Sequence, residues 1–424
     1  MYDVSQILTE FKSLVGWIDS ANPEIPKLGS GLTTSDSGKY VNQGHPLVTV
    51  DNIFHTAPDF DNYTASAYAA GTTYAAGDIC RYNNVVYISL KAANTGHTPI
   101  IGEWWTTLLS NHVDKLTDAA ITKVIDQVLL RKKLNRSTKG LLQNLLIFDG
   151  AGDSRSLIIQ EGRFVGMEIT LTPFDSIRAK VSQIGVQFSA ANKDKKIYLF
   201  HESQPEAIST HTFTARGGQY FDWSDTELEM KVADLNDAGG RFYLGYFEDD
   251  MAGQAVRKTY NFTVSPCAGC ITQNYNRHAY EQWTKYVTIR PFSIAHSYLN
   301  GASLPDLSGV QYEDDNNFGL NLALSVNCDY TDLLIANKSI FRTAIMYQGT
   351  YEVLMQIAYS TRMDYISQAT KDRAMLELKG DQEAKIQSFE KTLAREIEGL
   401  ELDFSGFNSP CLASRGSGIT WESI

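Results

Sequence analysis

Three kinds of functional signal are missing from the 424-residue sequence. Lysine and arginine form no long run, and the 37 basic residues are outnumbered by 49 acidic ones, which gives a formal net charge of −12 and argues against specific nucleic-acid binding. No segment approaches about 20 uninterrupted apolar residues, the length that a membrane-spanning helix needs. The motifs of nucleotide-binding loops, serine hydrolases and zinc proteases are absent, and so is the strand–helix alternation of a barrel hydrolase. We therefore expect no membrane span and no enzymatic activity.

Cysteine is also scarce, with five residues in the chain. The N-terminal residues do not resemble a secretory signal, because apolar residues from Val4 to Ile18 repeat at helical spacing and charged residues such as Glu10 and Lys12 interrupt them. These features indicate a soluble chain made in a cytoplasm. Five cysteines in such a chain do not predict a disulfide framework.

One cysteine pair has the spacing of a metal site. Cys267 and Cys270 form a C-x-x-C pair in a segment expected to be a loop, and this spacing lets two thiolates bind one zinc ion. Cys328 and Cys411 would complete four thiolate ligands, or His278 would replace one of them. The alternative is that all four are reduced cysteines without metal. Apart from this zinc, no cofactor is predicted.

Aromatic residues and turn residues alternate between Tyr63 and Ser110. Gly77-Asp78 and Asn83-Asn84 are typical of tight turns, and the runs between the turns suit short antiparallel strands. A sheet this small must build most of its core from aromatic rings. We expect an exposed three-stranded module in which some rings face solvent, where they would stack on a sugar.

This segment resembles the small chitin-binding carbohydrate-binding modules of bacterial chitinases and of many phage virion proteins. The matching pattern is an aromatic residue, then Tyr74-Ala-Ala-Gly77-Asp78, a β residue, spaced tyrosines, and later Pro99 and tryptophan. Tyr68 departs from it, because the family usually has tryptophan there. The alternative is a structural module whose aromatic residues are all core. The resemblance implies carbohydrate-binding residues Tyr68, Tyr74, Tyr82, Tyr87, Trp104 and Trp105.

The rest of the chain predicts four further segments. Residues 1–62 are expected to form a helix and an extended arm that orders against a neighbour, and residues 111–139 a linker helix. β-branched and aromatic runs between turns predict a β-sandwich of jelly-roll or immunoglobulin-like type over residues 140–266. Residues 267–424 are expected to be a mixed α/β C-terminal domain with helices. The predicted fold class is thus multidomain and mainly β, with helical segments.

The order of these parts, with segments such as 37–53 and 377–411, resembles virion structural proteins of tailed phages, and more narrowly those of crAss-like phages of Bacteroidetes that form rings below the portal. The resemblance implies a virion location, a homo-oligomeric ring that is twelvefold in such proteins, and contacts with neighbouring portal and tail proteins. The module would point outward toward host-surface glycan. The alternative is a surface or secreted polysaccharide-binding protein, or an accessory of a glycan-degrading enzyme.

Overall fold

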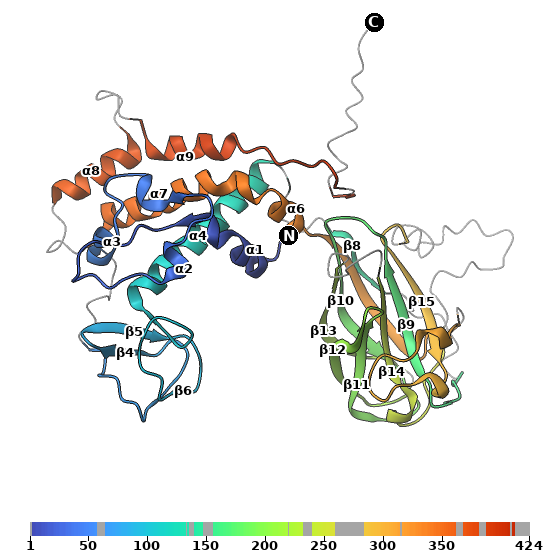
Figure 1. Cartoon of the computed structure of the whole chain (residues 1–424). Coiled ribbons are helices and arrows are strands. Elements are labelled where there is room, and N and C mark those ends of the chain that lie inside the picture. Colours follow the sequence, from blue (N-terminus) through green and yellow to red (C-terminus); the bar gives the residue numbers. More distant parts are fainter. Residues whose placement is uncertain are drawn as a thin grey trace, which may run out of the picture. The chain divides into compact units, whose positions relative to one another are not determined.

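The computed structural model describes residues 2–56, 64–132, 134, 140–146 (as backbone), 156–218, 220–231, 240–258, 284–313, 316–361, 368–380, 387–407 and 409–411. The chain divides into two compact units. The helical unit comprises Tyr2–Arg136 and Leu333–Ser405, and the β unit comprises Ser137–Asp332 and Gly406–Ile424. The fold is mixed α/β, with several antiparallel sheets, a small aromatic three-stranded sheet and C-terminal helices, whereas the sequence indicated a mainly β chain (Figure 1). Within the described ranges, no helix has the length and apolar character needed to cross a membrane.

A 24-residue helix, α4, is the centre of the helical unit. Its buried stripe includes Ile121, Val124 and Val128, which confirms the helix expected from their spacing, although α4 begins at Leu108 and so takes in residues assigned to the aromatic module. Helices α7 and α9 pack against it (Figure 1). The elements of this unit outside the module are α1 (Val4–Phe11), η1 (Lys12–Leu14), β1 (Val15–Gly16), α2 (Ser30–Thr33), β2 (Lys39–Tyr40), η2 (Val41–Gln43), α3 (Val50–Thr56), α4 (Leu108–Arg131), η6 (Lys338–Phe341), α7 (Arg342–Tyr359), α8 (Gln368–Lys379) and α9 (Phe389–Glu398), with α6 (Thr331–Ala336) at the boundary between the units.

The N-terminal segment folds back onto its own chain. Phe11 is fully buried, with its ring centroid 5.5 Å from that of Phe341, and the Trp17 indole Nε1 donates to Thr117 Oγ1 of α4 at 3.0 Å. The later part of residues 1–62 was expected to form an arm that orders against a neighbour, but Leu28, Val41, Val48, Val50 and Ile53 are buried within the unit. The structure differs from that expectation because these apolar side chains pack against residues that are distant in the sequence. Within the segment they are dispersed among glycine and polar residues and show no clear period.

Two glycines of the C-terminal helices play different roles. Helix α7 continues through Gly349, and a Cβ at this position would lie only 3.1 Å from both Cγ atoms of Val41. Next to it, Thr350 Oγ1 donates to the Val41 carbonyl at 2.9 Å. Gly380 follows the end of α8 with a φ of +74°, a left-handed conformation in which glycine commonly ends a helix.

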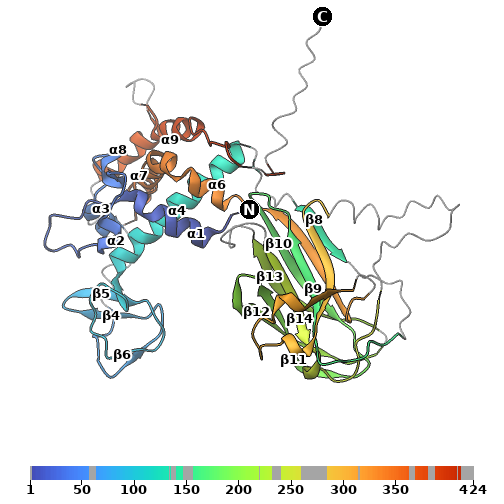
Figure 2. The same cartoon turned by 45° about the vertical axis from the view of Figure 1, so that its right-hand side comes forward.

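Two antiparallel sheets form the β unit (Figure 2). Between them, the Tyr246 hydroxyl donates to the Phe318 carbonyl at 2.9 Å, and the Tyr246 ring packs on Phe188. The four-stranded sheet has the order β13 (Asp222–Lys231), β10 (Ile177–Val186), β17 (Leu320–Cys328), β8 (Gly140–Leu146), and the six-stranded sheet the order β12 (Gln204–Ala215), β11 (Asn192–His201), β14 (Arg241–Phe247), β9 (Phe164–Leu171), β15 (Val287–Ile294), β16 (Val310–Tyr312).

Both faces of the six-stranded sheet are covered near β9. One face carries the aromatic cluster of Phe164, Phe200, Tyr243 and Phe292, and residues 299–310 pack against it. Strand β9 is therefore almost continuously buried and lacks the alternation of a half-exposed strand. Strands β15, β16 and β17 belong to these two sheets, although their residues were assigned to the C-terminal domain from the sequence.

Candidate functional site

The aromatic module contains the predicted three-stranded sheet. Strands β4 (Ile79–Tyr82), β5 (Val85–Ser89) and β7 (Trp105–Thr107) pair in the order β4-β5-β7, and β3 (Thr73–Tyr74) pairs with β6 (Asn94–Thr95). Asn83 and Asn84 adopt φ values of +50° and +62°, as a two-residue hairpin requires. Gly77 has a φ of +92°, and Asp78 Oδ2 accepts a hydrogen bond from the Ala75 amide at 2.7 Å. Asp78 thus stabilises this turn, which is the role that turn chemistry predicts.

Two of the six predicted site residues form the core of the module. Trp105 is 1% exposed and Tyr74 is 8% exposed, and their ring centroids lie 5.0 Å apart. Their polar atoms are also used internally, because Trp105 Nε1 donates to the His97 carbonyl at 2.8 Å and the Tyr74 hydroxyl accepts from the Ala69 amide at 2.9 Å. Cys80 completes this core, and burial raises the pKa of its thiol to about 11. These side chains stabilise the module and offer no face to a ligand.

Four predicted residues remain partly accessible. Tyr68, Tyr82, Tyr87 and Trp104 are half-buried. Tyr68 packs by its ring against Tyr74, Tyr82 and Trp105, so its own contribution is mostly to the core. The described module therefore brings three rings, those of Tyr82, Tyr87 and Trp104, to positions where a sugar could reach part of each.

Trp104 has neighbours that the sequence did not reveal. The His97 ring stacks on it at a centroid distance of 3.9 Å and an interplanar angle of 11°. The Lys91 ammonium lies 5.1 Å from the centroid of the Trp104 ring and forms an ion pair with Glu103, which lowers the pKa of the Glu103 carboxyl. A bound sugar would meet hydrogen-bonding groups at this ring as well as an apolar surface. Residues 91 and 97 precede Trp104 by 13 and seven positions, and no local pattern predicts this grouping.

The module continues directly into the helical unit. Strand β7 ends at Thr107, and α4 begins at the next residue. The Thr107 hydroxyl oxygen accepts a hydrogen bond from the Ser110 amide at 3.0 Å and caps the helix. On its C-terminal side the module is therefore fixed to the unit by a strand-to-helix junction without an intervening linker.

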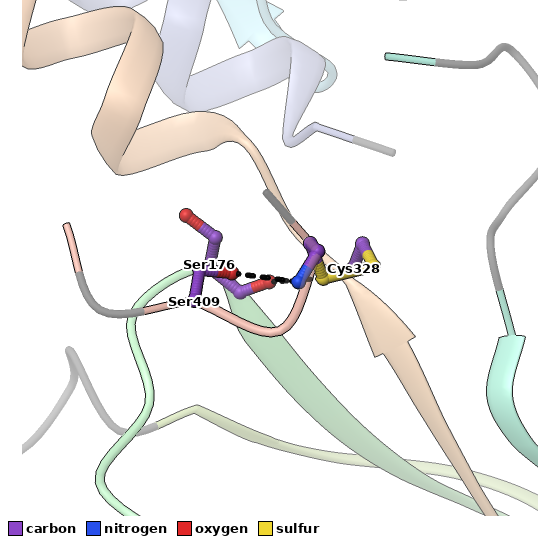
Figure 3. The surroundings of a disulfide bond; sticks show 4 residues. Ser176, Cys328 and Ser409 are labelled. Atoms are coloured by element: carbon purple, nitrogen blue, oxygen red, sulfur yellow. Dashed lines mark hydrogen bonds between the residues drawn. A yellow bond between two sulfur atoms is a disulfide. The ribbon is translucent and has the colours of Figure 1, made fainter. Parts of the chain in front are cut away.

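The structure places the predicted metal ligands differently. Cys328 and Cys411 are joined by a disulfide, with 5.9 Å between their Cα atoms, so their sulfurs are not thiolate ligands as the zinc hypothesis required (Figure 3). The expectation that the chain has no disulfide is thereby corrected. Cys267, Cys270 and His278 lie outside the described residues. Among the residues that are described, no group of three or more His, Cys, Asp or Glu side chains could hold a metal ion.

The disulfide holds the C-terminal segment on the β unit. Cys328 is the last residue of β17 and pairs with Ile177, the first residue of β10, and Cys411 Sγ lies 3.5 Å from the carbonyl oxygen of the preceding residue, Ser176 (Figure 3). Both cysteines are buried, with exposures of 1% and 4%. Between them, residues 333–405 run through the helical unit, so the bond closes a loop that contains α6, η6, α7, α8 and α9.

The acidic turn at Glu248–Asp250 is a structural element in part. Glu248 is 3% exposed, and its carboxylate accepts hydrogen bonds from the Arg163 guanidinium and from the Glu161 and Arg163 amides. The carboxylate of Glu248 thus orders the segment that precedes β9.

Comparisons with known proteins add no assignment. No family model, no curated protein and no solved structure matches this chain.

Proposed function

We propose that the chain is a structural protein of a tailed-phage particle, where copies of it form a ring in the portal–tail region and display the aromatic module outward. The junction at Thr107 carries this proposal. An accessory module of a secreted enzyme must sample substrate independently and is usually joined through a flexible linker. Here the module leads into the principal helix of a folded unit without such a linker, which suits a part fixed in an assembly.

In this proposal the β unit is a β-sandwich of jelly-roll type and supplies contacts between copies. Tyr220 is 80% exposed, and the neighbouring Phe221 and Trp223 rings lie 5.9 Å apart at the edge strand β13. Exposed aromatic residues are enriched at protein interfaces. The Trp223 ring also covers Gly185, where a Cβ would come within 3.0 Å of it, so Tyr220 is the better residue to vary. The net charge of −12 continues to disfavour nucleic acid as the partner.

Assembly is tested by electron microscopy and analytical ultracentrifugation of the full-length chain, alone and after isolation from particles. We expect a closed ring, and Tyr220→Asp should weaken it because a carboxylate would be desolvated in the interface. Tyr359→Asp, at a residue of the helical unit that is 56% exposed, is the matched control. A monomer in both settings contradicts the proposal.

Glycan binding by the module is tested separately. The Lys91, His97 and Trp104 group supports a stacking contact that is weak per site and gains strength from many copies in a ring. We expect particles or rings, but not monomers, to be retained on chitin or on capsular polysaccharide, and Trp104→Ala to abolish retention. Retention of an isolated monomer with an affinity equal to that of the ring would favour the alternative, a surface or secreted polysaccharide-binding protein.

A further inference from the structure

A cavity lies within the helical unit at the base of the aromatic module. Its volume is about 400 Å³, within the range of about 300–1,000 Å³ typical of small-molecule sites. Four parts of the chain line it: the α1–η1 segment, the segment around α2, the module and the first turns of α4. Its walls are therefore assembled only when the module is folded against the helices.

Three polar side chains on the wall have unused hydrogen-bonding capacity. Ser13 of η1, Thr106 of β7 and Asn111 of α4 are half-buried, and their side chains bond to no other residue in the described part of the chain. They come from three different elements and line the same space. Two hydroxyls and one amide can donate and accept at several points of one ligand.

The remaining wall limits what that ligand can be. The Lys12 ammonium is held by two carboxylates, at 2.8 Å from Asp114 Oδ1 and 3.1 Å from Asp118 Oδ1, so no uncompensated cation is left there for an anionic ligand. Val15, Leu32 and Leu90 supply apolar surface, and Leu90 is 46% exposed. The combination fits a neutral molecule that has hydroxyl groups on its rim and C–H groups on its faces.

We propose that this cavity binds a single neutral sugar residue at the base of the module. The site extends the glycan-binding part of the proposed function and is distinct from the half-buried ring of Trp104. Ring assembly does not depend on it, so the sugar-binding result and the assembly result can fail independently.

Gly31 allows a direct test, because it lines the cavity and a Cβ built there meets nothing within 4 Å. Gly31→Leu should therefore fill the cavity without displacing backbone. Gly71→Leu is the matched control, since a Cβ there also meets nothing within 4 Å and the residue does not line the cavity. Thr106→Val removes one hydroxyl at nearly constant shape and serves as a second variant if Gly31→Leu does not fold.

The measurement is saturation-transfer NMR on the full chain with the methyl glycosides of glucose, galactose, mannose and N-acetylglucosamine. We expect at least one to bind with a dissociation constant on the order of millimolar. In the Trp104→Ala background, which removes the ring of the other proposed contact, Gly31→Leu should abolish the remaining signal, Thr106→Val should weaken binding about tenfold, and Gly71→Leu should leave it unchanged. Absence of saturable binding by all four sugars overturns the proposal, as does binding that is lost in Trp104→Ala and kept in Gly31→Leu.

Discussion

Trp104 and Trp105 are neighbours in the sequence with opposite roles. Successive side chains at the start of a strand point to opposite faces, so one tryptophan enters the core and the other lies beside His97 and Lys91. A pattern of aromatic residues alone does not tell which is which. That is why the sequence placed both in the binding set, although the indole of Trp105 is hydrogen-bonded to a carbonyl inside the module.

The two tryptophans should respond differently to truncation. Trp105→Ala leaves a large cavity beside Tyr74 and should destabilise the module by about 3–5 kcal/mol, seen as loss of amide-exchange protection in β4, β5 and β7. Trp104→Ala should leave that protection nearly unchanged. Equal losses of protection in the two variants would show that Trp104 belongs to the core.

His112 of α4 gives the helical unit a predictable pH dependence. Burial lowers the pKa of His112 from its ordinary value near 6.5, against the opposing effect of its 3.0 Å contact with Gln356 Oε1. Below about pH 6.5 the unfolded chain binds a proton there that the folded chain does not, so stability is lost as pH falls toward the folded-state pKa.

We expect the free energy of unfolding of His112→Gln to decrease less than that of the wild type as pH falls. The difference between the two slopes should be at most about 1.4 kcal/mol per pH unit. Urea unfolding at pH 7.5 and pH 5.5 measures it. Burial also lowers the pKa of His45 and His211, so the comparison is the difference between wild type and variant, with His211→Gln as the control from the β unit. Identical pH slopes for wild type and His112→Gln would contradict the assignment.

At the scale of elements, the sequence predicted structures that depend on neighbouring residues. It did not predict contacts between residues that lie far apart in the chain. The spacing of Ile121, Val124 and Val128 predicts α4, and Asn83-Asn84 predicts the hairpin between β4 and β5, because both depend on neighbours in the chain. The burial of Val41 depends on α7, whose Thr350 is 309 positions away. No periodicity within residues 26–56 contains that information, so the segment was interpreted as an arm.

Because of its contact with Val41, glycine should be more stable than alanine at position 349, which is the reverse of the usual preference inside a helix. Glycine to alanine inside a helix usually stabilises by about 0.5–1 kcal/mol. In Gly349→Ala the new methyl meets both Val41 Cγ atoms, and overpacking of this kind costs about 1–3 kcal/mol. We therefore expect a net loss of stability in denaturant unfolding.

Val41→Ala provides the matched test of that contact. In the double variant, alanine at 349 should cost less than in the wild-type background or should stabilise, which is a favourable coupling in a double-mutant cycle. Additive effects of the two substitutions would mean that the loss arises elsewhere.

For the whole molecule, the disulfide shows what a sequence-based expectation about cysteine pairing can miss. Cys328 and Cys411 are 83 positions apart and have no spacing motif, so only the return of the chain to the β unit after Ser405 brings them together. The assignment of residues 287–328 failed for the same reason, because the partners of β15 and β17 are strands β9 and β10, which lie more than 100 residues earlier.

We expect Cys328→Ser/Cys411→Ser to lower the stability of the β unit by about 2–4 kcal/mol, through the loop entropy that the bond removes from the unfolded chain. Thermal unfolding with and without reductant measures it, and peptide mapping without reductant should recover the two cysteines as one linked fragment. Reduced wild type should match the double variant, which itself should not respond to reductant. An equal response of the double variant would exclude the bond as the cause.

The junction at Thr107 also has a mechanical consequence. If the module binds a surface while the rest of the chain is held in a particle, part of the load enters the helical unit through the peptide bond between Thr107 and Leu108. It then passes into a helix of 24 residues, about 36 Å long, whose apolar stripe is buried along most of its length. Tension at the module would thus be resisted by the packing of the whole unit around α4.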